Sequence, residues 1–142
     1  MKSWEGLKDE IRKVSKDKEM ARSISKMADT RRDALKLLED KAEFASISVE
    51  YYYEIIKELM TGIMAIEGYK TLSHEALIAY LSHNHKEFSQ AEITLIDELR
   101  KLRNKIVYQG FFIEPAFVDR NKNKVNDIIE RLLRLIKSEL SL

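Results

Sequence analysis

Residues 7 to 61 contain neither glycine nor proline, and this uninterrupted stretch limits the possible fold more than any other feature of the sequence. Strands are joined by turns, and most turns need one of these two residues for their backbone geometry. The whole chain has one proline, Pro115, and four glycines. Its 142 residues, 44% of them hydrophobic, suffice for the core of a single domain. We therefore expect an all-α protein.

Apolar residues recur every three or four positions, which is the spacing of amphipathic helices. Ser89 and Glu92 form a capping box at the start of one predicted helix, and Gly110 supplies its stop. Short loops join the predicted helices, so consecutive helices should lie antiparallel to each other. We expect an up-and-down bundle of four principal helices, preceded by an N-terminal helical extension. The helical patterns after that extension cover about residues 30–42, 46–67, 73–81, 89–109 and 118–140.

The N-terminal stretch carries a narrower apolar stripe than the rest of the chain. We expect residues 1–29 to form the helical extension and residues 30–142 to form the bundle. A narrow stripe of this kind packs either on its own bundle or on a helix of another chain. The sequence leaves open whether Thr30 caps a new helix or lies inside a continuous one. The stripe consists of Trp4, Leu7, Ile11, Val14, Met20, Ile24 and Met27.

Several classes of protein are disfavoured by what the sequence lacks. There is no cysteine, which excludes disulfides, thiolate nucleophiles and cysteine-bound zinc. No apolar run approaches the roughly 20 residues that span a bilayer, and Met1–Glu10 lacks the apolar centre of a signal peptide. We therefore expect a cytoplasmic protein without a membrane partner. No phosphate-binding loop or dinucleotide fingerprint occurs, so no cofactor is expected.

A metal site is also not expected from the sequence. His83 and His85 are separated by one residue and fall in a predicted loop. Two histidines with this spacing can chelate a metal, but no carboxylate or third histidine stands at a helical spacing beside them.

Arg103 is the first candidate functional residue. On a helical wheel it lies about 40° from Leu99, at the edge of the apolar stripe of helix 89–109. A guanidinium at this position either reaches solvent or a carboxylate of a neighbouring helix, or it faces a cleft or a second subunit and binds phosphate. Residues 100 to 124 include seven basic and two acidic residues, although the whole chain is only +1. The other candidates for phosphate or RNA contact are Arg100, Lys101, Lys105, Arg120, Lys122 and Lys124.

Two motifs give the chain a resemblance to a known family. Gly-Tyr-Lys-x-x-x-His occupies residues 68–74, and Arg-Asn-x-x-x-Tyr occupies residues 103–108. A helical bundle with these motifs, over about residues 31–140, resembles the HEPN superfamily. The resemblance implies a small α-helical domain that is usually dimeric. Many members are metal-independent endoribonucleases of toxin–antitoxin, abortive-infection and CRISPR systems. Others are non-catalytic and bind nucleotides or accompany a minimal nucleotidyltransferase.

The catalytic motif of the family is an arginine, a polar residue and, a few residues later, a histidine. Arg103 and Asn104 match the first two positions, but Tyr108 stands where the family has its histidine. Histidine titrates near neutral pH and can accept or donate a proton, whereas tyrosine, with a pKa of about 10, donates but hardly accepts. Arg103 can clamp phosphate, Asn104 can orient a ribose or the phosphate, and Tyr108 can stack on a base. These residues suit holding RNA better than cutting it.

The spacing of the second motif points to a dimer. On a regular helix, Arg103 and Tyr108 point about 140° apart, so within one chain they converge only if the helix frays near Val107. Two chains related by a two-fold axis can instead form a composite cleft, which is the arrangement that the resemblance implies. We therefore expect a homodimer that binds RNA or a nucleotide at this cleft, with weak or no nuclease activity.

Two other functions remain open at this stage. One is an active ribonuclease in which Tyr108 or a displaced histidine transfers the proton. The other is a non-catalytic helical partner of a nucleotidyltransferase, which would use the apolar stripe of the N-terminal extension as its contact surface. The histidines considered for the first alternative are His74, His83 and His85.

Overall fold

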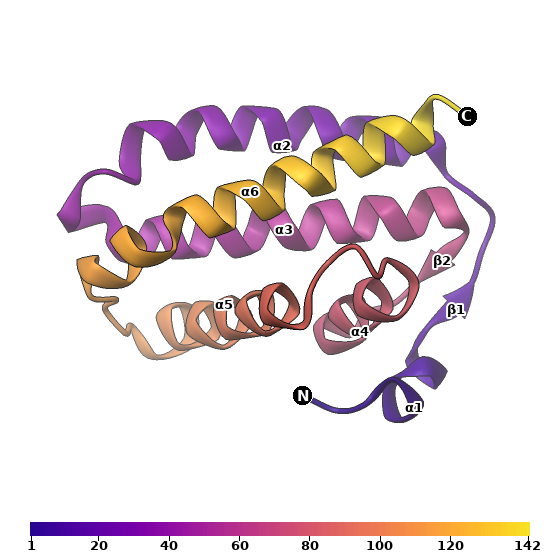
Figure 1. Cartoon of the computed structure of the whole chain (residues 1–142), viewed down its shortest axis with the longest axis horizontal. Coiled ribbons are helices and arrows are strands. Elements are labelled where there is room, and N and C mark those ends of the chain that lie inside the picture. Colours follow the sequence, from indigo (N-terminus) through magenta and orange to yellow (C-terminus); the bar gives the residue numbers. More distant parts are fainter.

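The computed structural model describes residues 1–142, and nearly all of its regular structure is helical. This confirms the all-α class. Two 3-10 turns, η1 (Lys8–Glu10) and η2 (Ala42–Phe44), and two short strands, β1 (Arg12–Lys13) and β2 (Tyr69–Lys70), complete the fold. The α-helices (Figure 1) are α1 (Trp4–Leu7), α2 (Lys18–Leu38), α3 (Ala45–Glu67), α4 (His74–Asn84), α5 (Gln90–Gln109) and α6 (Pro115–Leu140).

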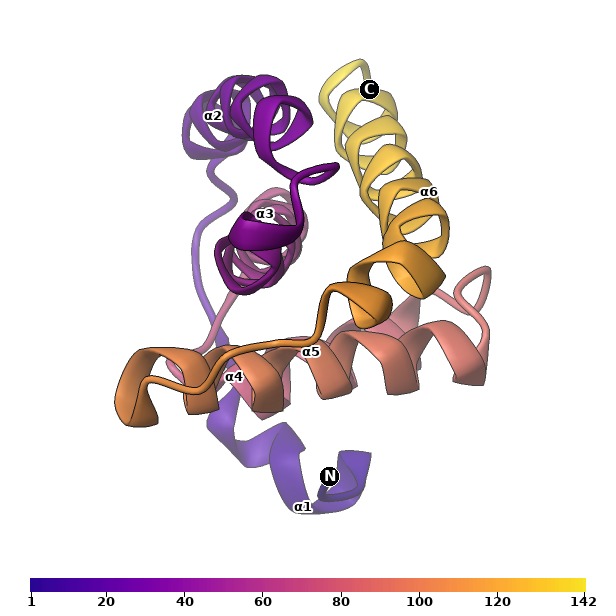
Figure 2. The ribbon, with the colours of Figure 1, turned by 90° about the vertical axis from the view of Figure 1, so that its left-hand side faces the viewer.

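Helix α3 lies at the centre of the molecule. It forms an antiparallel pair with α2, while α6 packs across both helices and α4 and α5 cover the opposite side (Figures 1 and 2). Tyr52, Ile56 and Leu59 of α3 have no exposed surface. Such complete burial follows from an apolar stripe broad enough to face helices on several sides, which is the pattern predicted for residues 46–67.

A glycine allows the closest approach between helices in this core. A Cβ atom at Gly62 of α3 would lie 2.8 Å from Cδ1 of Ile136 on α6 and 3.2 Å from Cγ2 of Ile24 on α2. Any side chain at position 62 would therefore push against two neighbouring helices at once. The glycine inside the predicted helix thus has a packing role.

The orientation of α5 differs from the predicted up-and-down arrangement. In Figure 1, α4 and α5 are seen nearly end-on while α2 and α3 run across the view. In Figure 2, α5 runs across and α3 is seen end-on, so α5 crosses α3 steeply. Short loops make consecutive helices neighbours, but the crossing angle is decided by how their side chains interdigitate.

Of the helical extension predicted for residues 1–29, residues 18–29 are helical as the first half of α2, but residues 1–17 do not continue this helix. Helix α1 is a single turn, and β1 pairs antiparallel with β2, with Arg12 opposite Lys70. Leu7 is 1% exposed and packs against Ala76 and Ala79 of α4. A short isolated helix is marginally stable, so contacts with α4 and β2 decide the conformation of this segment. Leu7 and Ile24 of the apolar stripe are therefore covered within the same chain, whereas Val14, Met20 and Met27 remain exposed.

Helix α2 settles the question of Thr30. It runs without a break from Lys18 to Leu38, so the expected boundary between residues 29 and 30 lies in the middle of a helix. The Thr30 hydroxyl donates a hydrogen bond to the carbonyl of Lys26 within that helix and does not cap a new one. Asp17 is the N-cap of α2, where its carboxylate accepts from the Met20 backbone N–H.

The ends of α5 follow the sequence signals. The Ser89 hydroxyl accepts from the Glu92 N–H, and the Glu92 carboxylate accepts from the Ser89 N–H, which completes the capping box. Gly110 has φ +64° and ends the helix in the left-handed conformation that glycine adopts most readily. None of the helices combines the length and the apolar character that crossing a bilayer requires.

Candidate functional site

Arg103, Asn104 and Tyr108 lie in the last two turns of α5, which stays helical through Gln109. Arg103 and Asn104 are half-buried, whereas Tyr108 is 73% exposed. Because the helix does not fray near Val107, Arg103 and Tyr108 of one chain point in different directions. The two side chains would share a ligand only if two chains contributed to the site.

The guanidinium of Arg103 takes part in no ion pair. Its Nη1 donates a hydrogen bond to the side-chain oxygen of Asn104 at 3.2 Å, which leaves its charge without a carboxylate. A half-buried cation without a counter-ion favours an anionic ligand more than a paired one does. Asn104 also helps to hold the guanidinium in place.

Three of the other basic candidates are already paired with acidic residues. Arg100 lies 2.9 Å and Lys101 lies 3.2 Å from the carboxylate of Asp97, which is 7% exposed. These contacts hold the pKa of Asp97 below its usual value against the effect of its burial. Lys122 lies 2.8 Å from Asp40. Each of these cations is therefore less able to bind phosphate than Arg103.

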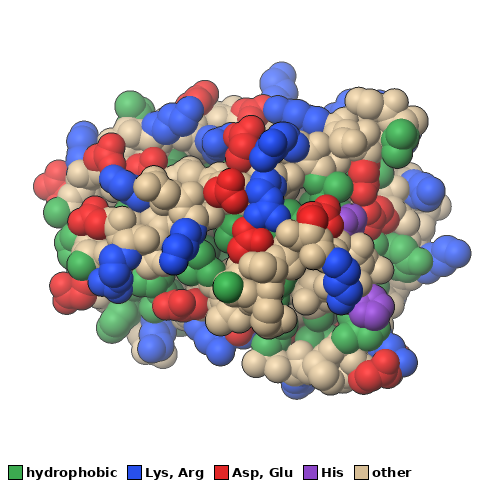
Figure 3. Space-filling model, in the orientation of Figure 1, with side chains coloured by type: hydrophobic (Ala, Val, Ile, Leu, Met, Phe, Trp, Pro, Cys, Tyr) green, Lys and Arg blue, Asp and Glu red, His purple; other side chains and the backbone are tan.

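The remaining basic candidates, Lys105, Lys124 and Arg120, have different surroundings from one another. Lys105 belongs to the same turns of α5 as Arg103 and lies over the ring of Phe111, 5.6 Å from its centre. Lys124 lines a groove between α5 and α6 together with acidic side chains, and Arg120 is exposed on α6. On the face shown in Figure 3, Lys and Arg side chains are mixed with Asp and Glu. Acidic partners thus interrupt the basic stretch of sequence in the folded protein.

Exposed aromatic residues follow Arg103 at the end of α5. Phe112 is 85% and Phe111 46% exposed, next to Tyr108 and a half-exposed Val107. The sequence pattern indicates no function for the two phenylalanines, because residues 111–113 resemble only a short crossing between helices. Clustered exposed apolar side chains mark binding surfaces, and aromatic faces beside cations accept stacked nucleobases.

One of the three histidines, His74, lies within electrostatic range of Arg103. It is the first residue of α4, half-buried, with its ring 5.8 Å from that of Tyr53. Burial and the charges of Lys57, Arg103 and Arg100 lower the pKa of His74. His74 is therefore neutral at physiological pH and can accept a proton. The Tyr53 hydroxyl beside it is buried without a hydrogen-bond partner.

The other two histidines lie at the opposite end of α4 from His74. His83 stacks on Trp4, with ring centres 4.1 Å apart and planes nearly parallel. His85 points its Nε2 at the carboxylate of Glu67, at 3.0 Å from Oε2. Neither histidine can act on a ligand held by Arg103, and the two do not face a common ion.

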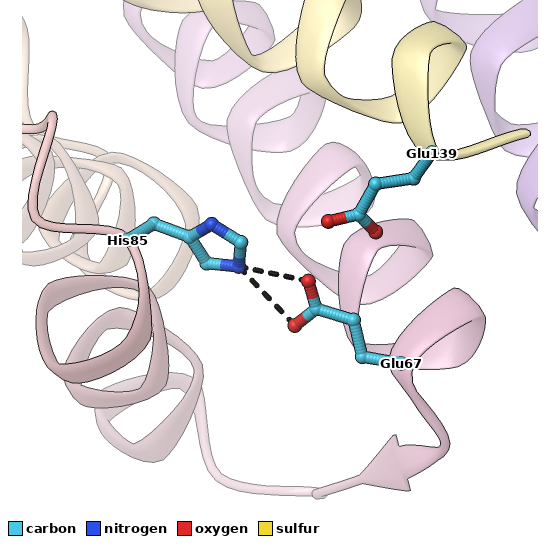
Figure 4. A group of neighbouring side chains, drawn as sticks. All are labelled: Glu67, His85 and Glu139. Atoms are coloured by element: carbon cyan, nitrogen blue, oxygen red, sulfur yellow. Dashed lines mark hydrogen bonds and ion pairs between the residues drawn. The ribbon is translucent and has the colours of Figure 1, made fainter. Parts of the chain in front are cut away.

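A second cluster of titratable side chains lies where the C-terminal ends of α3, α4 and α6 meet (Figure 4). It consists of Glu67, His85 and Glu139, whose ligand atoms lie within 4.8 Å of one another. Tyr80 donates a hydrogen bond to Oε1 of Glu67 at 2.5 Å. No sequence motif indicates this cluster, because its members are far apart in the chain.

Charges in this cluster shift the pKa values of its members. Burial, together with the neighbouring Glu67 carboxylate, raises the pKa of Glu139. Burial alone would also raise the pKa of Glu67, but the hydrogen bonds from His85 and Tyr80, together with the neighbouring Glu139, outweigh it and lower that pKa. The hydrogen bond to Glu67 raises the pKa of His85, with smaller contributions from Glu87 and Glu139. The folded protein therefore holds protons here that the unfolded chain would release.

We expect the free energy of unfolding, measured in EDTA by urea titration, to fall as the pH rises from about 6.5 to about 8. Above its unfolded pKa near 4.5, Glu139 keeps its proton only in the folded state, so each rise in pH favours unfolding. Above about 6.5 His85 acts in the same direction, while Glu67 contributes no slope above about 5. His74, whose pKa is lowered, acts in the opposite direction, but only below about 6.5. Glu139→Gln should therefore flatten the fall between about pH 6.5 and 8. The exposed Glu98→Gln is the control, and parallel curves for wild type and Glu139→Gln would contradict the assignment.

Comparisons of the chain with models of known protein families, with curated protein sequences and with solved structures give no match. The resemblance to the HEPN superfamily therefore rests on the two motifs at residues 68–74 and 103–108.

Proposed function

We propose that this protein is a HEPN-like, homodimeric cytoplasmic protein that binds RNA or a nucleotide at the C-terminal end of α5, with weak or no nuclease activity. The observation that carries the proposal is the unpaired guanidinium of Arg103 at the same end of α5 as several exposed aromatic residues. A guanidinium binds phosphate through two parallel hydrogen bonds, and the amide of Asn104 is close enough to join it.

The exposed rings supply the second half of such a site. Tyr108 and Phe112 offer flat apolar faces to solvent, and Lys105 adds a positive charge to the same turns of α5. Stacking on an aromatic side chain contributes about 1–3 kcal/mol per base and tolerates any sequence. Phosphate contact at Arg103 with stacking at Tyr108 suits single-stranded RNA or a free nucleotide.

A homodimer explains why Arg103, for phosphate contact, and Tyr108, for stacking, lie on different faces of α5. Across a two-fold axis, Tyr108 of one subunit can face Arg103 of the other, which restores the composite cleft expected from the motif. Burial between subunits would also cover Val107 and Phe111, which are about half exposed in the single chain. The absence of a histidine at position 108 supports binding rather than cleavage.

Titration of a fluorescently labelled single-stranded RNA at low salt, followed by anisotropy, tests this proposal together with sedimentation of the protein. We expect saturable binding by a species of twice the chain mass. A monomer that shows no change in anisotropy at any protein concentration would contradict the proposal.

The environment of His74 favours a second candidate function, that of a metal-independent ribonuclease. A neutral His74 would take the proton of the RNA 2′-hydroxyl while that oxygen attacks the adjacent phosphorus. The bond from phosphorus to the 5′ oxygen would break, and Tyr108 would donate a proton to that oxygen. Arg103 would stabilise the charge on the phosphorane. The products would be a 2′,3′-cyclic phosphate and a 5′-hydroxyl.

We expect any cleavage of RNA by this protein in EDTA to depend on His74. His74→Asn should lower the cleavage rate by about a hundredfold or more, since positioned acid–base groups contribute about 10²–10⁴. His83→Asn should leave it unchanged, because His83 is stacked on Trp4 away from Arg103. Gel analysis of a labelled RNA gives both rates. Cleavage that survives His74→Asn would rule out this histidine as the base.

The third function considered from sequence has less support. A partner of a nucleotidyltransferase would need an exposed apolar stripe at the N-terminus. In the structure Leu7 is buried against α4, and Trp4 and Ile11 are half-buried. The part of this surface around α1 is therefore largely covered within the same chain, while Val14, Met20 and Met27 stay exposed.

A further inference from the structure

We propose that Glu67, His85 and Glu139 form a binding site for a divalent transition-metal ion such as Zn²⁺ or Mn²⁺. The site is separate from the end of α5 and does not depend on the function proposed above. One imidazole nitrogen and two carboxylate oxygens form a mixed donor set that suits Zn²⁺, Mn²⁺ or Fe²⁺. Mg²⁺ prefers an all-oxygen octahedral shell, so the imidazole disfavours it.

The three side chains converge from three different helices (Figure 4). Glu67 is the last residue of α3, His85 is the C-cap of α4, and Glu139 lies in the last turn of α6. Ligand atoms around a tetrahedral Zn²⁺ lie about 3.4 Å apart, given bond lengths of about 2.1 Å. Nε2 of His85 and Oε2 of Glu67 are already 3.0 Å apart, and the Glu139 oxygen completes a triangle within 4.8 Å. A small rotation of side chains brings all three to bonding distance.

An unsatisfied atom points to the same ligand. Oε2 of Glu139 is buried and has no hydrogen-bond partner in the protein. A buried carboxyl oxygen without a hydrogen-bond partner is unfavourable, and a metal ion that displaces the proton of Glu139 would supply the missing partner. No lysine or arginine pairs with Glu67 or Glu139, and His85 is the one basic side chain that contacts the Glu67 carboxylate.

The surrounding backbone also favours a cation. Helices carry partial negative charge at their C-terminal ends, and the site lies where three such ends meet. The Tyr80 hydroxyl fixes the Glu67 carboxylate, and the Glu87 carboxylate lies 4.0 Å from Nδ1 of His85. A hydrogen-bonding partner such as Tyr80 orients a metal ligand. Nε2 of His85 faces the Glu67 carboxylate. Three protein ligands leave at least one coordination position for water or another ligand.

Metal binding should therefore tie the ends of α3, α4 and α6 together. Protein stripped with EDTA and then dialysed free of it should bind one equivalent of Zn²⁺ or Mn²⁺ by isothermal titration calorimetry. Zn²⁺ should raise the Tm, because a ligand that binds only the folded state stabilises it. Co²⁺ should give visible absorption bands of a low-coordinate site. Mg²⁺ at the same concentration should leave the Tm unchanged.

Two variants remove one ligand each while keeping a similar side-chain volume, namely Glu139→Gln and His85→Gln. We expect each to weaken Zn²⁺ affinity by at least tenfold, because loss even of a residue that only orients a metal ligand commonly costs about 10–100-fold. His83→Gln is the matched control, since this exposed neighbouring histidine should not be a ligand. Circular dichroism establishes that each variant is folded.

Two results would overturn the metal site. The first is no Zn²⁺ or Mn²⁺ binding by folded wild-type protein at 100-fold excess of metal, about the excess at which a weak site would still be seen. The second is binding that Glu139→Gln and His85→Gln leave intact while His83→Gln abolishes it. That pattern would assign the metal to a surface histidine. Neither result would affect the proposal for RNA binding at Arg103, which is measured with a different ligand.

Discussion

Arg103→Ala is expected to weaken binding of single-stranded RNA by about 10- to 100-fold at low salt. The guanidinium has no carboxylate to satisfy inside the protein, so its removal affects ligand binding and little of the fold. Hydrogen bonds to charged groups contribute about 1.5–3 kcal/mol, which corresponds to this decrease in affinity. Removing one cation that binds a phosphate should also reduce the slope of log K against log salt by about 0.7. Anisotropy titrations at several KCl concentrations measure both quantities.

Two further variants separate charge from geometry in this experiment. Arg103→Lys keeps the charge but loses the planar fork, so it should retain most of the salt slope while losing part of the affinity. Lys122→Ala is the matched control, because Lys122 is already paired with Asp40. Equal decreases in affinity for Arg103→Ala and Lys122→Ala would show that RNA is attracted by the overall positive charge and not bound specifically by Arg103.

Leu59→Ala is expected to lower the free energy of unfolding by about 2–5 kcal/mol, the range for a leucine truncated in a packed core. Leu59 has no exposed surface and lies on α3, which packs against every other long helix. The cavity left behind could close only by moving several helices at once. Urea denaturation with an unchanged m-value would show a loss of stability rather than a change of unfolded state.

The matched control for this substitution is Leu37→Ala. Leu37 lies on α2 and is 72% exposed, so the same chemical change should alter stability by no more than about 0.5 kcal/mol. Similar losses for the two variants would mean that α3 is not the centre of the core. A loss confined to Leu59→Ala would support the central position of α3.

Helices with local signals were predictable from the sequence. The apolar stripe of α3, the capping box of Ser89 and Glu92, and the stop at Gly110 are each encoded within a few residues. The N-terminal segment was not predictable in the same way. Its conformation depends on pairing of β1 with β2 and on Leu7 packing against α4, and both contacts join residues far apart in the chain.

The candidate sites show the same division between local and distant information. A helical wheel places Arg103 at the edge of the buried stripe, which agrees with its half-buried side chain. Which carboxylate each cation meets depends on the fold, and Asp97 is taken by Arg100 and Lys101. The histidine motif at positions 83 and 85 suggested no further ligand. The fold supplies Glu67 and Glu139 to His85 from two other helices.

Gly62 has a consequence for the far end of the molecule. Ile136, which lies against this glycine, is only three residues before Glu139 on α6, and Glu67 follows Gly62 by five residues on α3. Because position 62 has no side chain, α3 and α6 approach each other closely there, and each helix carries one of the two carboxyl groups near its C-terminal end. A methyl group at position 62 would push α3 and α6 apart and move Glu67 away from Glu139. The glycine therefore influences the distance between the two carboxyl groups.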